Sequence, residues 1–374
     1  MAFPLLNSIA LSFIHYIAIF ASRPYISLLA ASIGTDNIGI GLIAGSYSGI
    51  QVIMALYAGK IIDRIGPRIP AIFGSVILVI GLVGLSIARH WLFILLCSVL
   101  IGFSHLFVLV SSQCVVTGWA SGSERENNVG LMTFMTSAAS FLGPVLGGWL
   151  QDWRGISNSF LYMAFIGAAA LILSFTIPNI NYKEKSHDGV STWSIIRNPG
   201  ILRAVLIGGT VLFSMEVLTI YFPLYGKEIG LSTAAIGTIF SVRGLSSMVV
   251  RPFMARILQL FGRKLVLFWS LVIGGFSISL YGLTANYYTL MVISVISGFA
   301  LGLALPLTLV MVAEIASEEQ RGRAMALRIM GNFAGQTVSP ILFGVLAASL
   351  GLAPIFWVSG GLLMLCFKLI KDTG

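Results

Sequence analysis

Long apolar runs separated by short polar stretches dominate this chain. Residues 71–88, 91–116 and 266–284 are examples, and each is close to or above the ~18 residues that cross a bilayer as a helix. A backbone in hydrocarbon must satisfy its own hydrogen bonds, so these runs predict helices. The whole pattern predicts twelve spans, at residues 5–32, 38–62, 70–88, 91–118, 128–151, 157–177, 201–228, 233–260, 264–284, 287–314, 322–349 and 352–370.

The second half of the chain repeats the first after about 196 positions, which is the signature of an internal duplication. The matching pairs are Gly34 and Gly230, Gly41 and Gly237, Gly66 and Gly262, Gly102 and Gly298, Pro144 and Pro340, Gly155 and Gly351, and Phe160 and Phe356. We therefore predict an all-α integral membrane protein of two parallel six-helix repeats, a class typical of transporters. Its predicted parts are an N-terminal bundle at 1–177, a cytoplasmic linker at 178–199 and a C-terminal bundle at 200–374.

Composition and charge support the same class. Hydrophobic residues make up 57% of the chain and charged residues only 9%, against roughly 25% charged in soluble domains. Most basic residues fall in alternate predicted loops, whereas Arg89, Arg154 and Lys227 fall in the others. Because basic loops stay in the cytoplasm, both termini are predicted to be cytoplasmic. Topology thus explains the net charge of +9, and no nucleic-acid partner is needed.

No pattern predicts an enzyme, a cofactor or a metal site. Cys97, Cys114 and Cys366 lie in apolar runs without the close spacing of metal ligands, and we interpret them as packing residues. The first apolar run continues into a full-length helix, so we expect no cleaved signal peptide. Short loops and no recognisable transit peptide favour a multi-pass protein of a prokaryotic plasma (inner) membrane, in contact with the lipid bilayer.

The loop after the second predicted helix reads GKIIDRIGPR at residues 59–68. It resembles the G-x-x-x-D-R-x-G-R-R signature of the major facilitator superfamily, although Pro67 replaces a basic residue. The resemblance implies a conformational latch between the two halves on the cytoplasmic side, carried by Gly59, Asp63, Arg64, Gly66 and Arg68. The second copy has Gln259 in place of the acid. The alternative interpretation is an ordinary basic loop.

The fifth predicted helix contains GPVLGG, with Gly143, Pro144, Gly147 and Gly148 at the signature positions. This resembles the G-P-x-x-G-G motif of drug/proton antiporters in the same superfamily. The alternative is a general packing motif, because glycines four apart let helices approach closely. Such antiporters usually have an arginine in helix four, where this chain has Ser98. The superfamily resemblance also implies a monomer that works by alternating access.

Ionisable residues inside predicted spans are candidates for function, because burying charge in a membrane costs free energy. Glu216 and Arg243 are predicted at similar depth, where they could form an ion pair, and Arg23 is predicted to face the same cavity. We predict Glu216, with Arg243, as the proton-coupling site, the alternative being a purely structural pair. His105 is a further proton candidate, because imidazole titrates near neutral pH, although a structural histidine is the simpler interpretation.

Two arginines against one acid indicate an anionic group on the cargo. Polar and aromatic residues at similar depth complete the predicted substrate-binding set, which is Arg23, Tyr25, Tyr47, Gln51, Tyr221, Asn332 and Gln336. The first hypothesis is proton-coupled export of small amphipathic compounds, such as drugs or metabolites. The alternative is a carrier of organic anions or amphiphilic metabolites that works as uniporter, exchanger or importer. A third hypothesis is a membrane sensor built on a transporter fold. The sequence shows no recognisable signalling domain that would favour it.

Overall fold

A computed structural model describes residues 3–118, 122–178, 197–317 and 321–370, and the predicted linker lies almost entirely outside them. In these ranges the chain forms helices without strands. The first half, residues 3–178, contains α1 (Phe3–Ser32), α2 (Asn37–Ile65), α3 (Arg68–Ile87), α4 (Trp91–Gly118), α5 (Gly122–Arg154) and α6 (Ile156–Ser174). The second half, residues 197–370, contains α8 (Pro199–Glu228), α9 (Thr233–Val250), η1 (Arg251–Phe253), α10 (Met254–Phe261), α11 (Arg263–Tyr281), α12 (Tyr287–Ile315), α13 (Arg321–Leu350), α14 (Leu352–Leu365) and η2 (Cys366–Leu369).

Among the described residues, twelve helical segments are long and apolar enough to cross a membrane. Their bounds agree with the predicted spans to within a few residues at most ends. The eighth span is not one regular helix, because α9, η1 and α10 follow each other between Thr233 and Phe261. Large apolar side chains such as Phe165, Ile172 and Trp269 are exposed on the outside of the bundle, as expected for a surface that faces lipid.

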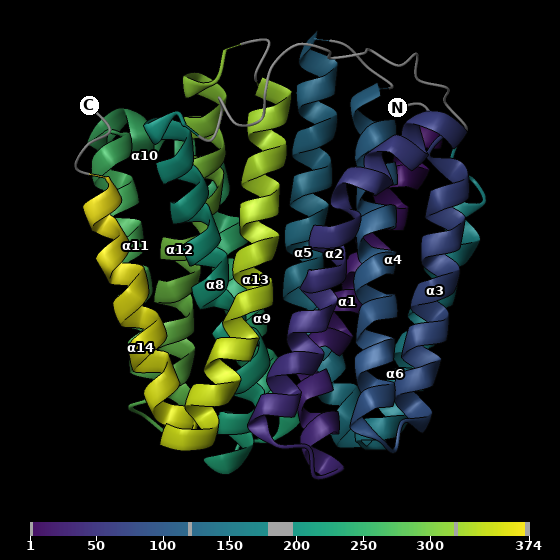
Figure 1. Ribbon diagram of the computed structural model, residues 1–374, viewed down its shortest axis with the longest axis vertical. Coiled ribbons are helices and arrows are strands. Elements are labelled where there is room, and N and C mark those ends of the chain that lie inside the picture. Colours follow the sequence, from purple (N-terminus) through teal and green to yellow (C-terminus); the bar gives the residue numbers. More distant parts are fainter. Residues whose placement is uncertain (1–2, 119–121, 179–196, 318–320, 371–374) are drawn as a thin grey trace.

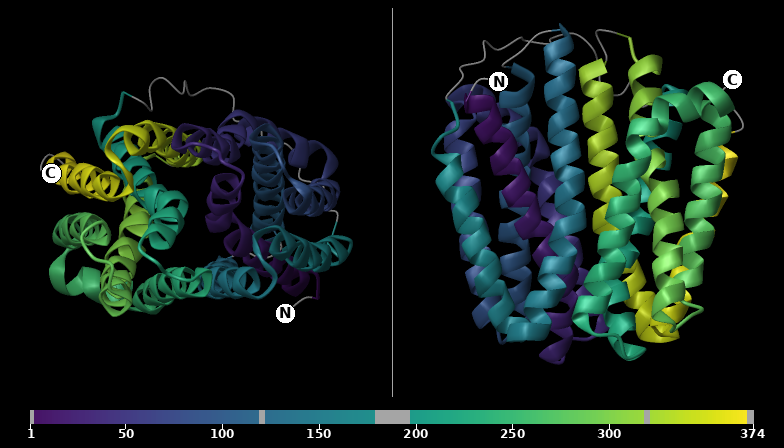
Figure 2. Two further views of the ribbon diagram at one scale, coloured as in Figure 1. Left: turned by 90° about the horizontal axis from the view of Figure 1, so that it is seen from below. Right: turned by 180° about the vertical axis from the view of Figure 1, so that it is seen from behind.

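The helices of each half gather on their own side of the molecule (Figure 2). The start of α1 and the end of η2 lie at the same end, which we call the terminal end, and the opposite end is called the far end (Figure 1). Between the halves, α5 packs against α9, α2 packs against α13, and α1 meets α8. The residues that join the two halves therefore come from the same helices of each repeat.

The turns between helices display the duplication directly. All six residues with positive φ in the described structure are glycines, and they form the repeat pairs Gly34 and Gly230, Gly66 and Gly262, and Gly155 and Gly351, with φ between 75° and 86°. Other residue types rarely adopt this conformation, so the sequence retains glycine at each turn. The repeat read from the sequence is thus a structural repeat.

A quasi-symmetric contact, which we call the far-end seal, closes the far end of the interface. Tyr25 donates a hydrogen bond to the carbonyl of Pro144 at 2.6 Å, and Gly237 of the second half packs directly on that carbonyl and hydroxyl. The counterpart is built from Tyr221, Pro340 and Gly41, with a hydrogen bond of 2.5 Å. Proline at position 144 or 340 leaves a carbonyl one turn earlier without its helical partner, and its own carbonyl accepts from the tyrosine. Only glycine allows the opposite helix to come so close.

We predict that Gly237→Ala opens the far-end seal. The added Cβ would lie 2.6 Å from the Tyr25 hydroxyl and still closer to the Pro144 carbonyl, and such overpacking typically costs about 1–3 kcal/mol. The conformational equilibrium should shift towards molecules in which the two halves are further apart at the far end. Distances between spin labels at the far ends of α6 and α14 measure this shift.

Gly361→Ala is the matched control, because Gly361 also lies inside a helix but has nothing within 4 Å of the added Cβ. Its distance distribution should equal that of the wild type. Equal distributions for both variants would contradict the role of Gly237 in the seal.

Candidate transport site between the two halves

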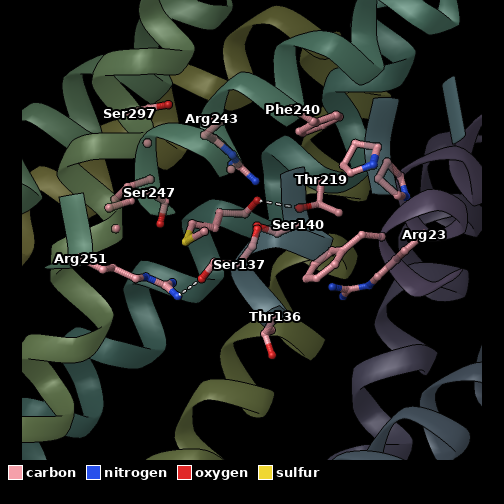
Figure 3. Close-up of a pocket in the computed structure, with 18 residues that line it drawn as sticks. Arg23, Thr136, Ser137, Ser140, Thr219, Phe240, Arg243, Ser247, Arg251 and Ser297 are labelled. Carbon is pink, nitrogen blue, oxygen red and sulfur yellow. Dashed lines mark hydrogen bonds between the residues drawn. The ribbon is translucent and has the colours of Figure 1, made fainter. Parts of the chain in front are cut away.

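A cavity of about 210 Å³ lies between the halves, bordered by α1, α5, α8, α9 and α12 (Figure 3). Its lining residues lie near the middle of these helices. Apolar side chains, including Phe20, Met215, Phe240 and Leu301, form part of its wall. The polar lining consists of Arg23, Thr136, Ser137, Ser140, Thr219, Arg243, Ser247, Arg251 and Ser297.

An ion pair between Arg23 and Glu216 connects the two halves beside this cavity. The pair is well shielded, with 14% of the Arg23 side chain and 3% of the Glu216 side chain exposed. The guanidinium also lies 4.2 Å above the Tyr47 ring and donates to Ser48 at 3.4 Å. The predicted pairing of Glu216 with Arg243 is therefore wrong for this conformation, because the cross-half partner Arg23 occupies the carboxylate.

Arg243 faces the cavity without a counterion among the described residues. Its guanidinium carbon lies 5.4 Å from the centre of the Phe240 ring, and its buried Nη1 has no hydrogen-bond partner. Glu216 remains close enough to act on Arg243 electrostatically. Arg243 is consequently a free hydrogen-bond donor and a positive charge at the wall of the cavity.

Arg251 is a second arginine of the cavity that the sequence reading missed. It lies inside the predicted span 233–260 but is not among the predicted site residues, and the structure places it at the first residue of η1, at the wall of the cavity. It donates to the Ser137 hydroxyl of the opposite half at 2.5 Å, and its Nε is buried without a partner. Its position two turns after Arg243 was the signal that could have revealed it.

His105 lies outside the cavity, inside the first half. Its ring stacks on His15 at 5.8 Å and meets Tyr16 edge-on at 5.0 Å and Tyr47 at 6.1 Å. Both ring nitrogens of His15 and Nδ1 of His105 lack hydrogen-bond partners. The sequence reading did not single out His15, because nothing in the sequence placed α1 and α4 at this contact.

The seven residues predicted to bind substrate occupy different places in the structure. Tyr25 and Tyr221 belong to the far-end seal, where their hydroxyls donate to proline carbonyls, so their contact with cargo stays a prediction. Gln51 donates to the carbonyl of Gly102 at 3.2 Å, and Tyr47 packs under Arg23. On α13, Gln336 accepts from Ser48 at 3.3 Å, and Asn332 is 9% exposed. Of the seven predicted residues, only Arg23 lines the cavity.

The helix-five signature makes contacts within the first half and also across to the second half. Gly143 and Gly147 bring α5 onto α1 at Phe20 and Ala21, whereas Gly148 brings it onto the Thr233 carbonyl of α9.

The predicted latch residues Gly59, Asp63, Arg64, Gly66 and Arg68 lie at the terminal end, from the end of α2 to the start of α3. Asp63 is exposed, and no described residue forms an ion pair with it.

The described residues contain no group of three or more His, Cys, Asp or Glu side chains that could hold a metal ion.

Asp152 forms a cross-half cap that the sequence reading missed. Its carboxylate accepts hydrogen bonds from the backbone nitrogens of Thr233 and Ala234, at 3.1 Å and 2.8 Å, and from the Thr233 hydroxyl. These nitrogens begin α9, so an acid of one half caps a helix of the other and meets the positive end of its dipole. The repeat counterpart is Ala348, which has no such group. The far end is thus held more strongly on the α5–α9 side.

Comparison with known proteins agrees with this architecture. The family model of the Major Facilitator Superfamily matches residues 9–235 and 218–372. The chain belongs to the major facilitator superfamily. It is therefore a multi-pass membrane transporter for small molecules, which agrees with the expectation that it is not an enzyme.

Curated relatives are distant but cover most of the chain. The quinolone resistance protein NorA of Staphylococcus aureus (strain MRSA252) is 21% identical over 349 residues, which are 89% of this chain and 88% of NorA. An uncharacterised transporter of the superfamily from Methanocaldococcus jannaschii is 19% identical over 341 residues, with the same coverage.

Solved structures share the fold. A variant of the nucleoside transporter NupG superposes with a TM-score of 0.84 at 14% identity and covers 98% of this chain and 100% of NupG. A POT family transporter in complex with a thioalcohol-conjugated peptide superposes with a TM-score of 0.82 at 14% identity, which covers 98% of this chain and 95% of that transporter. The predicted fold class is confirmed.

We predict that Arg23→Gln destabilises the protein markedly, because it leaves the Glu216 carboxylate buried without its counterion. Breaking a buried ion pair typically costs about 3–5 kcal/mol, whereas replacing both partners costs much less. The double variant Arg23→Gln/Glu216→Gln should therefore melt at a higher temperature than Arg23→Gln alone. Thermal unfolding of the purified proteins tests this, and equal losses in both would contradict the pairing.

Proposed function

We propose that this protein is a proton-coupled secondary transporter that exports small amphipathic compounds by alternating access. The observation that carries the proposal is the Arg23–Glu216 ion pair, which joins the two halves beside the cavity. Adding a proton to Glu216 removes the negative charge that holds Arg23. Protonation would therefore weaken a contact between the halves and change the charge of the cavity in a single step. His105 is a weaker candidate for this role, because it does not line the cavity.

Alternating access follows from the asymmetry between the two ends. The far-end seal and the Asp152 cap close one end, and we propose that the cavity between the halves opens at the other. We propose that residues 1–177 and 200–374 rock about the central pair, so that the seal opens when the terminal end closes. We also propose that the terminal end faces the cytoplasm, in a plasma membrane, and that the protein works as a monomer.

Export is favoured by the relatives rather than by the cavity itself. NorA is named a quinolone resistance protein, and a transporter confers resistance by moving the compound out of the cell. The helix-five motif points the same way by its resemblance to drug/proton antiporters. The cavity supports an amphipathic cargo, because its wall combines aromatic and aliphatic side chains with hydroxyls and arginines.

The second candidate function is an organic-anion carrier, and the unpaired Arg243 favours it. The two candidates differ in the sign of coupling. A cargo that competes with the proton for Glu216 moves opposite to protons. An anion that replaces Glu216 beside Arg23 instead favours protonation of the displaced carboxylate, so cargo and proton move together.

Glu216→Gln should abolish cargo-driven proton movement in proteoliposomes and leave exchange of cargo across the membrane in place, because glutamine cannot ionise. A pH-sensitive dye inside the vesicles, with cationic, neutral and anionic compounds added outside, measures the proton movement and its direction. Glu314→Gln is the matched control, because Glu314 is an exposed acid paired with Arg263 at the surface. Uphill transport at the wild-type rate in Glu216→Gln would refute the coupling role.

Asp63→Asn should slow conformational switching without changing cargo affinity. In the present conformation Asp63 is exposed at the terminal end, and we propose that it gains its partner only when that end closes. Cargo exchange rates in proteoliposomes and equilibrium binding to purified protein separate the two effects. Gln259→Asn, at the repeat counterpart, should retain the wild-type rate. A wild-type rate for Asp63→Asn would remove the latch from the mechanism.

A further inference from the structure

The charge in the cavity is unbalanced. Three arginines line it, and no acid is among the lining residues. Glu216 beside the cavity neutralises Arg23, which leaves Arg243 and Arg251 without an acidic partner among the described residues. Two unneutralised charges inside a membrane span are costly unless something compensates them. No side chain in the described part of the chain supplies the missing charge, so an anionic ligand is the natural source of it.

Each of the two arginines has a buried nitrogen without a hydrogen-bond partner, which a ligand could satisfy. Nη1 of Arg243 and Nε of Arg251 are both buried and unpartnered. Arg251 otherwise holds only the neutral Ser137 hydroxyl, a weaker acceptor than an anion. Planar guanidinium groups with free donors suit carboxylates and phosphates, which accept two parallel hydrogen bonds.

The spacing defines the shape of the ligand. Arg243 in α9 and Arg251 at the start of η1 are eight residues apart along the eighth span, so their backbones are about 12 Å apart along the helix axis. The hydroxyls of Ser140 and Ser247 lie between them in the cavity, and Phe20 and Leu301 contribute apolar wall (Figure 3). A compact anion would reach only one arginine, whereas an elongated one would reach both.

We propose that Arg243 and Arg251 form a two-point anion site, and that the cargo is an elongated amphipathic dianion with one anionic group at each arginine. The inference rests on the proposed transport function and names its substrate class. One anionic group binds Arg243 at the middle of the bundle. The other takes Arg251 from Ser137, and the apolar segment between them packs on the cavity wall. Cargo binding thereby exchanges a cross-half hydrogen bond for a contact to the cargo.

The test measures binding to the full-length protein in lipid nanodiscs by calorimetry, with empty nanodiscs subtracted. The probes are α,ω-dicarboxylic acids of increasing chain length and their monomethyl esters, which have the same chain but one carboxylate. Wild-type protein should bind a diacid of the fitting length at least about tenfold more tightly than its monoester, as expected for one added charge-assisted contact.

Variants separate the two arginines. Arg251→Gln should bring the diacid down to the affinity of the monoester and leave the monoester unchanged, whereas Arg243→Gln should weaken both. Arg251→Lys should retain part of the preference, which distinguishes lost charge from lost folding. Arg256→Gln is the matched control, because Arg256 is exposed on the next helix outside the cavity.

Equal affinity of wild-type protein for diacid and monoester at every chain length would overturn the proposal, and so would equal losses in Arg251→Gln and Arg256→Gln. The assay involves no proton gradient and no transport. A diacid preference that survives in Glu216→Gln would therefore support the anion site even if proton-coupled export failed. Conversely, the proton-movement assay in proteoliposomes can confirm coupling even if the protein shows no preference for diacids.

Discussion

A charge inside a membrane needs a partner, and this requirement organises the interface between the two halves. Arg23 and Glu216 satisfy each other, but they stand on opposite halves, so neither half is electrostatically complete alone. A separation of the halves at this level would leave an arginine and a carboxylate in a poorly solvated environment. The ion pair therefore restrains the relative position of the two halves.

The duplicated sequence provides a symmetric scaffold on which asymmetric chemistry is placed. The seal built from Tyr25, Pro144 and Gly237 repeats almost exactly as Tyr221, Pro340 and Gly41. The chemically active positions do not repeat: Arg23 corresponds to Thr219, Glu216 to Phe20, Arg243 to Tyr47 and Asp152 to Ala348. Packing at the interface thus follows the repeat, whereas these charged residues lie at positions whose repeat counterparts are uncharged.

The asymmetry affects how the molecule would open. On the α5–α9 side, glycine packing is reinforced by Asp152, which satisfies the first backbone nitrogens of α9 across the interface. On the α2–α13 side, Asp36 caps its own helix α2, as its repeat counterpart Ser232 caps α9, but Asp152 has no acidic counterpart because position 348 is alanine. The cavity with its three arginines also lies on the α5–α9 side. The cavity and the reinforced part of the seal therefore share the same pair of helices.

The sequence by itself determined the number of spans, the duplication, the turn glycines and the superfamily, because hydrophobic length and glycine at positive φ are local requirements. It also singled out Arg23, Glu216 and Arg243 as ionisable residues inside the spans. Only the tertiary structure decided their partners. Which residues meet across the interface depends on how each helix is rotated about its own axis, and a span that is apolar on nearly every side does not reveal this rotation. That is why Glu216 pairs with Arg23, why Tyr25 and Tyr221 seal the far end, and why Arg251 and Asp152 emerged only once α5 and α9 were side by side.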